Sequence, residues 1–528
     1  MKRNLALCLA AVLLCSALAA SCSKPVAPPA SSGVTADSQT QGSTTSTSLD
    51  ATGVPTQSGA SEPGGSEQPG NPSGTTARSP LSTKAPVETK STARGITTTA
   101  GKAPTTAKPE EDTMKTAMQE FLNVTPKVTK IPAYNPDSDP KSGANAWSNI
   151  EAITYDGAMF NKRKTKVFAY IGFPEGASAS KKVPAIVLVH GGGGHAYAEW
   201  VKMWTDRGYA AIAMDTTGFF PSETGKGVAG RESDNAAWWY FGLYGDFTQS
   251  GYVNAPNNDE MKNSSQSLDR QWMYHAIAST MLARNVLAAD SRVDTSKIGI
   301  TGISWGGVIT SLAIGYDPNY AFAIPVYGSG YLGESHGWMG PIFDKANTKE
   351  IWSAADRFAQ VKMPVLWLGW SNDTPFSINS NSKSYDDTKA AGAVLCMKVH
   401  WGHSHGQGWQ PQEAFRFADS IVKNGPAMTT CVTEPKGRNI SFTIKPASDA
   451  TKVTAQIIYI NEKLSYSSKT PGSWETIDQS WKAQGCTVEG NTVKGTLPSL
   501  AKSYYVELTT TTPSGKYITT TRFVEDLR

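Results

Sequence analysis

The hydrophobic residues between positions 152 and 424 form short continuous runs that alternate with longer helical patterns. Unbroken runs of Val, Ile, Leu and Ala are typical of strands buried on both faces, and intervening helices indicate a mostly parallel sheet. The expected strands are 166–173, 185–189, 209–214, 298–302, 321–326, 365–368 and 394–399, and the expected helices are 198–207, 268–289, 308–315 and 412–423. We therefore predict an α/β fold with helices on both faces of the sheet.

Residues 428–528 have a different pattern, in which helix signals are weak and short strand-like runs recur. The expected strands are 440–444, 453–460, 487–494 and 504–511, with turns at 471–472 and 513–515. This spacing predicts a small antiparallel β-sandwich. Trp474 and Trp481 would either line a carbohydrate-binding face or pack in the core and against the neighbouring domain.

The first residues combine a short basic start with the apolar run 5–20, which is the pattern of a secretory signal. Ala20-Ser21-Cys22 is similar to a bacterial lipoprotein cleavage site, so we expect a lipid on Cys22. Simple cleavage after Ala19 is the alternative, because Leu18 lies one position further from the cysteine than that pattern prefers.

Residues 23–112 are almost entirely Ser, Thr, Gly, Pro and Ala. A segment with so few apolar residues cannot bury enough surface to offset the entropy of ordering, and we expect a disordered tether. The predicted order is a signal peptide in 1–22, the tether in 23–112, a catalytic domain in 113–427 and the sandwich in 428–528.

Charge and cysteine content narrow the classes of function. A net charge of +4 on 528 residues, without a concentrated basic stripe, does not indicate nucleic-acid binding. Cys8 and Cys15 lie in the signal, and the remaining Cys396, Cys431 and Cys486 lack the spacing of metal ligands. Cys431 and Cys486 could form a disulfide outside the cytoplasm or stay as two thiols. No metal site is predicted.

The pentapeptide Gly302-Ile303-Ser304-Trp305-Gly306 follows the strand 298–302 and precedes a helix. A serine in this context lies on a sharp strand-to-helix turn with its hydroxyl exposed above the edge of the sheet. Side chains at Gly302 and Gly306 would collide where strand and helix approach each other. Ser304 is therefore the candidate nucleophile.

The glycine run Gly191–Gly194 follows His190 at the end of another buried strand. Backbone N–H groups in such a loop, together with that of the residue after the nucleophile, can form an oxyanion hole. We assign the two donors to Gly192 and Trp305, with Gly193 as the alternative to Gly192. His190 is expected to brace the loop.

Two later strands end in candidate partners for the serine. Asp373 follows the strand 365–368, and His403 follows the strand 394–399 after a bend at Gly402. A serine nucleophile needs an imidazole base, which a carboxylate orients and stabilises. The order Ser304, Asp373, His403 is the one expected for a serine hydrolase of this fold, and His405 is the alternative base.

These motifs resemble the α/β-hydrolase superfamily over residues 152–424. The stretch 187–215, the Gly-Ile-Ser-Trp-Gly-Gly elbow and Trp401-Gly402-His403-Ser404-His405-Gly406 are similar to the acetyl xylan esterase, dienelactone hydrolase and prolyl oligopeptidase branch. The resemblance implies a serine hydrolase that needs no metal or organic cofactor.

We accordingly expect an exported carboxylic ester hydrolase that works through an acyl-enzyme, with acetylated polysaccharide or oligosaccharide as substrate. It would be held at the membrane by the lipid anchor. A serine peptidase of the prolyl oligopeptidase type is the first alternative, and a surface carbohydrate-binding protein on a hydrolase scaffold is the second. The sequence leaves the oligomeric state open.

Overall fold

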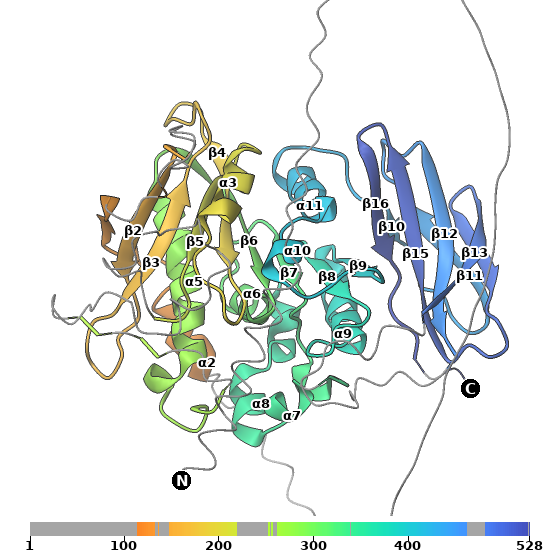
Figure 1. Cartoon of the computed structure of the whole chain (residues 1–528), viewed down its shortest axis with the longest axis horizontal. Coiled ribbons are helices and arrows are strands. Elements are labelled where there is room, and N and C mark those ends of the chain that lie inside the picture. Colours follow the sequence, from red (N-terminus) through yellow and green to blue (C-terminus); the bar gives the residue numbers. More distant parts are fainter. Residues whose placement is uncertain are drawn as a thin grey trace, which may run out of the picture. The chain divides into compact units, whose positions relative to one another are not determined.

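A mixed sheet of sixteen strands runs through the described part of the chain, with helices packed against it (Figure 1). The computed structural model describes residues 113–132, 136, 147–218, 252, 253, 255, 256, 261–337, 339–461, 481–525 and 527. The predicted signal peptide, Cys22, the tether and Trp474 lie outside these residues.

Six neighbouring strands of the sheet run parallel, in the order β5-β4-β6-β7-β8-β9. They are β4 (Val183–Val189), β5 (Ala210–Met214), β6 (Val293–Ile303), β7 (Ala323–Val326), β8 (Leu366–Trp370) and β9 (Val394–Lys398). Three antiparallel strands extend the β5 side, namely β3 (Lys166–Gly172), β2 (Ile150–Asp156) and β1 (Val128–Lys130). The predicted parallel sheet is confirmed, whereas β1 and β2 were not predicted.

Helices cover both faces of the parallel strands. The long ones are α3 (Ala198–Thr205), α5 (Trp272–Ala289), α6 (Trp305–Tyr316), α9 (Ile378–Thr388) and α11 (Gln412–Val422). Because parallel crossovers are right-handed, α3 lies on the face opposite α5, α6 and α9. α11 packs against α3 on the same face, where the ring centroids of Trp204 and Phe415 are 4.8 Å apart. Shorter helices are α2 (Thr113–Gln119), α7 (Gly340–Phe343), α8 (Ala346–Trp352) and α10 (His405–Gly408).

The strands after residue 428, which we call the C-terminal strands, are all antiparallel to their neighbours. They are β10 (Thr430–Cys431), β11 (Asn439–Lys445), β12 (Lys452–Ile460), β13 (Lys482–Glu489), β14 (Thr492–Thr496), β15 (Ser503–Thr512) and β16 (Gly515–Thr520). The prediction of one strand over 487–494 is wrong. Gly490, with φ of 57°, lies in a tight turn there that joins β13 to β14.

The C-terminal strands continue the sheet that contains the six parallel strands. β16 pairs with β9 through Thr520 and Leu395. A second hydrophobic cluster lies among these strands, with Phe442 of β11, Ile457 of β12 and Val506 of β15 buried in it. The antiparallel strands are confirmed, while a separate β-sandwich domain remains a prediction. Cys431 and Cys486 are free thiols, so the possible disulfide between them is not formed.

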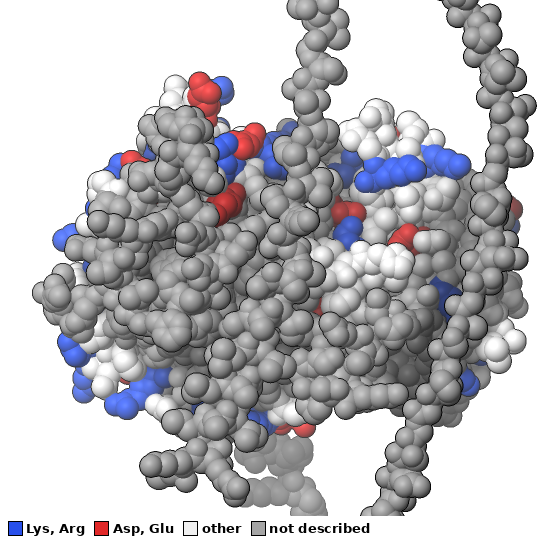
Figure 2. All heavy atoms as spheres, viewed as in Figure 1, with Lys and Arg blue, Asp and Glu red and all other residues white. Residues whose placement is uncertain are grey.

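Acidic and basic side chains are interspersed on the described surface that faces the viewer in Figure 2. Several form exposed ion pairs, such as Lys202 with Asp206 at 2.6 Å and Lys494 with Glu489 at 2.7 Å. Pairs of this kind contribute little to stability, typically about 0–1 kcal/mol each. Among the described residues, the helices are too short or too polar to cross a membrane.

Candidate active site

Ser304 lies on the turn between β6 and α6, in a backbone conformation that residues other than glycine rarely adopt. Its φ is 59° and its ψ is −118°. Such a conformation costs on the order of 1–3 kcal/mol and persists where the surroundings enforce it. Here the N–H of Ser304 donates to the carbonyl of Val326 at 2.9 Å, and the N–H of Val308 donates to the carbonyl of Ser304 at 3.1 Å.

The two glycines of the elbow are required by close backbone approach. A Cβ on Gly302 would lie 2.1 Å from the carbonyl oxygen of Gly306, and one on Gly306 would lie 2.0 Å from that of Val189. Real Cβ atoms essentially never come that close to backbone atoms. The predicted collision is therefore confirmed, and it explains how the helix packs so tightly on the neighbouring strands.

Asp373 and His403 meet beyond the ends of β8 and β9. Nδ1 of His403 lies 2.7 Å from Oδ2 of Asp373. The other oxygen of Asp373 accepts a hydrogen bond from the N–H of Phe376 at 2.9 Å, and Asp373 is fully buried. The carboxylate of Asp373 thus contacts an imidazole with one oxygen and fixes its own turn with the other.

Two aromatic rings stack against the imidazole of His403. The ring of Tyr327 is stacked on it with centroids 4.2 Å apart, and that of Phe376 lies 5.8 Å away at an interplanar angle of 15°. The hydroxyl of Tyr327 donates to the carbonyl of Gly402 at 2.5 Å. Sequence reasoning missed Tyr327, although its position directly after β7, beside the elbow strand, was an available signal.

His405 has a different partner. Its Nε2 accepts a hydrogen bond from the N–H of Gly191 at 2.9 Å. Desolvation, helped by the nearby His190 and His403, lowers the pKa of His405 to about 3, so the ring is neutral near pH 7. A Cβ on Gly191 would lie 2.9 Å from Cβ of Ser304, so this contact lies next to the serine.

His190 holds the other side of the glycine loop. Its Nδ1–H donates to the carbonyl of Gly191 at 2.7 Å, and its Nε2 accepts from the N–H of Thr216 at 2.9 Å. Burial lowers the pKa of His190 to about 4. This arrangement fits the expected bracing role. Gly192 and Gly193 lie in the exposed part of the loop, and Trp305 is the first residue of α6.

Among the described residues, His, Cys, Asp and Glu side chains do not gather in groups of three or more that could hold a metal ion. What the site offers is a half-buried hydroxyl on a strained turn, an imidazole paired with a buried carboxylate, and a glycine loop held by two neutral histidines. These groups suit nucleophilic attack on a carbonyl carbon.

Residues 167–414 are similar to a known family of proteins. Residues 167–414 match the model of the Dienelactone hydrolase family. The resemblance to the α/β-hydrolase superfamily is therefore confirmed, and the matched region forms a hydrolase domain.

Individual relatives cover the chain to different extents. The chain is 30% identical to dipeptidyl-peptidase 5 of Aspergillus fumigatus over 139 residues, which are 25% of this chain and 16% of that protein. An acetyl xylan esterase from Paenibacillus sp. R4 is similar in structure, with a TM-score of 0.43 and 17% identity, covering 60% of this chain and 96% of that one. An acylaminoacyl peptidase of Pyrococcus horikoshii has a TM-score of 0.37 and 18% identity, covering 52% and 42%.

Proposed function

Because residues 167–414 form a domain of the dienelactone hydrolase type, we propose that this hydrolase is a serine esterase that cleaves carboxylic esters through an acyl-enzyme. The single observation that carries the proposal is the pairing of His403 with the buried Asp373 beyond the strand ends. An imidazole held in this way is the base that a serine nucleophile needs.

In the proposed reaction, Oγ of Ser304 attacks the acyl carbonyl carbon and its proton passes to Nε2 of His403. His403 then protonates the departing alcohol, and Asp373 holds the imidazole and stabilises its charged form. The N–H groups of Gly192 and Trp305 bind the oxyanion. A water molecule, deprotonated by His403, releases the acid and restores Ser304.

His403 is favoured over His405 because the two rings have different partners. Nε2 of His405 is occupied by the N–H of Gly191, and the low pKa of His405 makes its ring a weak base. Nδ1 of His403 is paired with the carboxylate of Asp373, and in this proposal Nε2 of the same ring transfers the proton. In this proposal His405 supports the glycine loop.

A substrate panel on the purified protein tests the reaction class. We expect turnover of 4-nitrophenyl acetate and covalent labelling by a fluorophosphonate, and we expect Ser304→Ala to abolish both. Methyl ferulate and an alanyl anilide complete the panel. A protein that resists the fluorophosphonate and cleaves none of these substrates would be a binding protein on a hydrolase scaffold.

The peptidase alternative rests on one observation, the 30% identity to dipeptidyl-peptidase 5 over 139 residues. That match covers only 16% of the relative, so it concerns a part of its length. Faster turnover of the anilide than of the acetyl ester, measured as kcat/KM, would favour the peptidase.

The substrate and the location of the enzyme are further parts of the proposal. We propose that acetylated polysaccharide or oligosaccharide is the substrate, at a membrane to which Cys22 anchors the chain by a lipid. Expression in a bacterium with labelled palmitate should give a lipid-bearing protein in the membrane fraction, and Cys22→Ser should lose both the label and the membrane association. A mature chain that starts at Ala20 and is free in the medium would contradict the anchor.

A further inference from the structure

The loop that carries the proposed catalytic acid is bonded to the C-terminal strands. We call Ser371–Asp373, directly after β8, the acid loop, and all three of its residues are buried. Its main chain continues the sheet, since the N–H of Ser371 donates to the carbonyl of Lys398 at 2.9 Å. The side chains of Ser371 and Asn372 bond to residues more than a hundred positions later in the sequence.

Each of the two residues before Asp373 has a partner in the C-terminal segment, namely Tyr505 on β15 for Ser371 and Trp481, directly before β13, for Asn372. Oγ of Ser371 lies 2.8 Å from the hydroxyl of Tyr505 on β15, and this hydrogen bond is buried. Oδ1 of Asn372 accepts a hydrogen bond from Nε1–H of Trp481 at 2.6 Å. The two partners also contact each other, with the ring centroids of Trp481 and Tyr505 5.5 Å apart in an edge-to-face arrangement.

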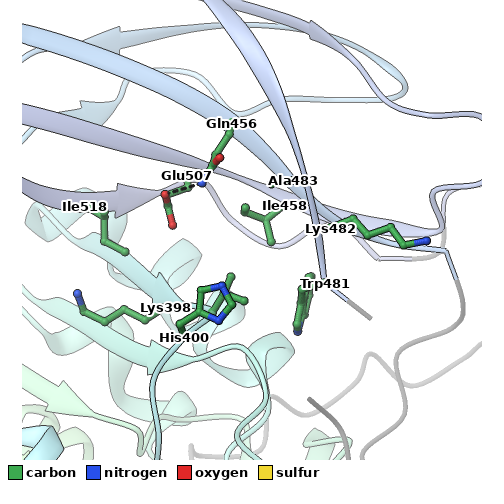
Figure 3. Close-up of a pocket in the computed structure, with 10 residues that line it drawn as sticks. Lys398, His400, Gln456, Ile458, Trp481, Lys482, Ala483, Glu507 and Ile518 are labelled. Atoms are coloured by element: carbon green, nitrogen blue, oxygen red, sulfur yellow. Dashed lines mark hydrogen bonds between the residues drawn. The ribbon is translucent and has the colours of Figure 1, made fainter. Parts of the chain in front are cut away.

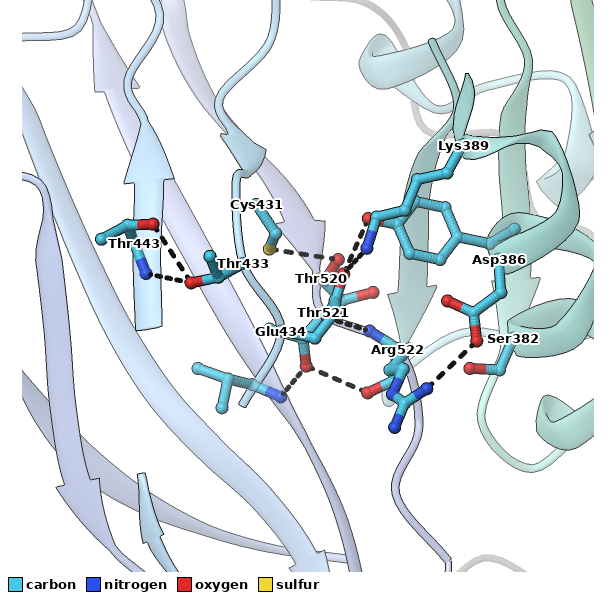
Figure 4. A network of polar contacts seen from close by, with 12 residues as sticks. Ser382, Asp386, Lys389, Cys431, Thr433, Glu434, Thr443, Thr520, Thr521 and Arg522 are labelled. Carbon is cyan, nitrogen blue, oxygen red and sulfur yellow. Dashed lines mark hydrogen bonds and ion pairs between the residues drawn. The ribbon is translucent and has the colours of Figure 1, made fainter. Parts of the chain in front are cut away.

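The C-terminal strands are themselves fixed to the catalytic domain by the polar network in Figure 4. The carboxylate of Glu434 accepts hydrogen bonds from the hydroxyl of Tyr385 on α9 at 2.9 Å and from the N–H of Arg522 at 3.1 Å, and it also pairs with Lys389. The N–H of Phe523 donates to Oγ of Ser382 on α9 at 2.7 Å. These contacts hold the C-terminal segment, which includes Tyr505 and Trp481, against α9.

We infer that Tyr505 and Trp481 are positioning residues for the catalytic acid, so that the C-terminal strands complete the active site. This inference rests on the proposed function of Asp373. A hydrogen bond on each residue before the acid limits the motion of its carboxylate, which must stay within about 3 Å of the imidazole. A displacement of about 1 Å in a catalytic group can cost about a hundredfold in rate.

Trp481 has a second environment, which makes Tyr505 the better residue to change. Trp481 stands at one end of a cavity of about 300 Å³, with Lys398 and Ile518 at the other end (Figure 3). Replacing Trp481 would alter this cavity as well as the bond to Asn372. Tyr505→Phe removes only a buried hydroxyl, because the ring and its contact with Trp481 are kept.

The neighbouring Tyr504 provides a matched control. It lies on the same strand, is equally buried, and its hydroxyl donates to the carbonyl of Gly437 at 3.1 Å, within the C-terminal segment. Tyr504→Phe removes the hydroxyl that bonds to Gly437, and Tyr505→Phe removes the hydroxyl that bonds to Ser371. They differ in whether that bond reaches the acid loop.

The experiment measures kcat and KM on 4-nitrophenyl acetate, the rate of fluorophosphonate labelling of Ser304, and the melting temperature. We expect Tyr505→Phe to lower kcat and the labelling rate about tenfold with KM within twofold. Tyr504→Phe should keep all three kinetic values within twofold at a similar loss of melting temperature. Ser371→Ala should match Tyr505→Phe, and the double variant should be no slower than either.

Equal kinetics of the two tyrosine variants would overturn the inference and leave the proposed function intact. Independent, additive losses in the double variant would also overturn it, because Ser371 and Tyr505 would then act separately. A wild-type protein that neither turns over the ester nor reacts with the fluorophosphonate would remove the proposed function and the inference together.

Discussion

His403 and Asp373 are 30 residues apart in the sequence, and Nδ1 of one lies 2.7 Å from Oδ2 of the other. The two residues follow the carboxyl ends of β8 and β9, which are adjacent parallel strands. If it serves catalysis, His403→Ala should lower kcat on 4-nitrophenyl acetate by about 10⁴-fold or more, close to the effect of Ser304→Ala. The measurement is steady-state kinetics of the purified variants.

The double variant Ser304→Ala/His403→Ala tests whether the two residues act together in catalysis or contribute to it independently. Members of a triad work as one unit, so combining the substitutions should add little to either alone. Circular dichroism and the melting temperature control for folding. Substantial turnover by His403→Ala would pass the role of base to another residue.

His405→Ala should be a milder change than His403→Ala. It removes the acceptor of the Gly191 N–H and so loosens the loop beside Ser304, without taking away the proposed base. We expect kcat on the acetyl ester to fall by about tenfold to a hundredfold, less than the loss of a triad member. His405→Gln, which can offer an acceptor oxygen, should recover part of the loss. If His405→Ala were as inactive as Ser304→Ala, the assignment of the two histidines would have to be exchanged.

The serine turn and the position of the acid could be predicted from the sequence, because both depend on residues that are close together in the chain. Gly302 and Gly306 are dictated by a strand and a helix that are adjacent in the chain, and Asp373 follows a recognisable buried strand. Parallel strands bring their ends to one edge of the sheet, so the meeting of Asp373 with a histidine follows from their order in the chain.

The contacts that hold the site could not be predicted in the same way. Tyr505 lies 134 residues after Ser371, and nothing in the pattern of β15 distinguishes it from the equally buried Tyr504. Alternation along a strand fixes which side a residue faces and says nothing of what lies opposite. The choice between His403 and His405 likewise depended on the partner of each ring, which is a property of the packed structure.

Gly306→Ala tests the close approach at the elbow by stability. Its Cβ would lie 2.0 Å from the carbonyl oxygen of Val189, and backbone cannot swing aside as a side chain can. Overpacking of this kind should lower the free energy of unfolding by about 3 kcal/mol or more, measured by urea denaturation. Gly485→Ala is the control, since nothing lies within 4 Å of a Cβ there. Equal midpoints of the two variants would mean that the strand and the helix can separate without cost.

Because burial lowers the pKa of His190, the free energy of unfolding should fall as the solution becomes more acidic. The pKa of His190 is about 4 in the folded protein and about 6.5 in an unfolded chain, so between these values the unfolded state binds more protons. Stability from this group is complete above pH 6.5 and is lost as the pH falls toward 4, by about 2 kcal/mol between pH 7 and pH 5. His190→Gln can keep a donor for Gly191 and an acceptor for Thr216 but does not titrate. Urea denaturation at both pH values should therefore show a loss between pH 7 and pH 5 that is smaller in His190→Gln by about 2 kcal/mol. An identical loss in both proteins would show that His190 takes up its proton as readily in the fold as outside it.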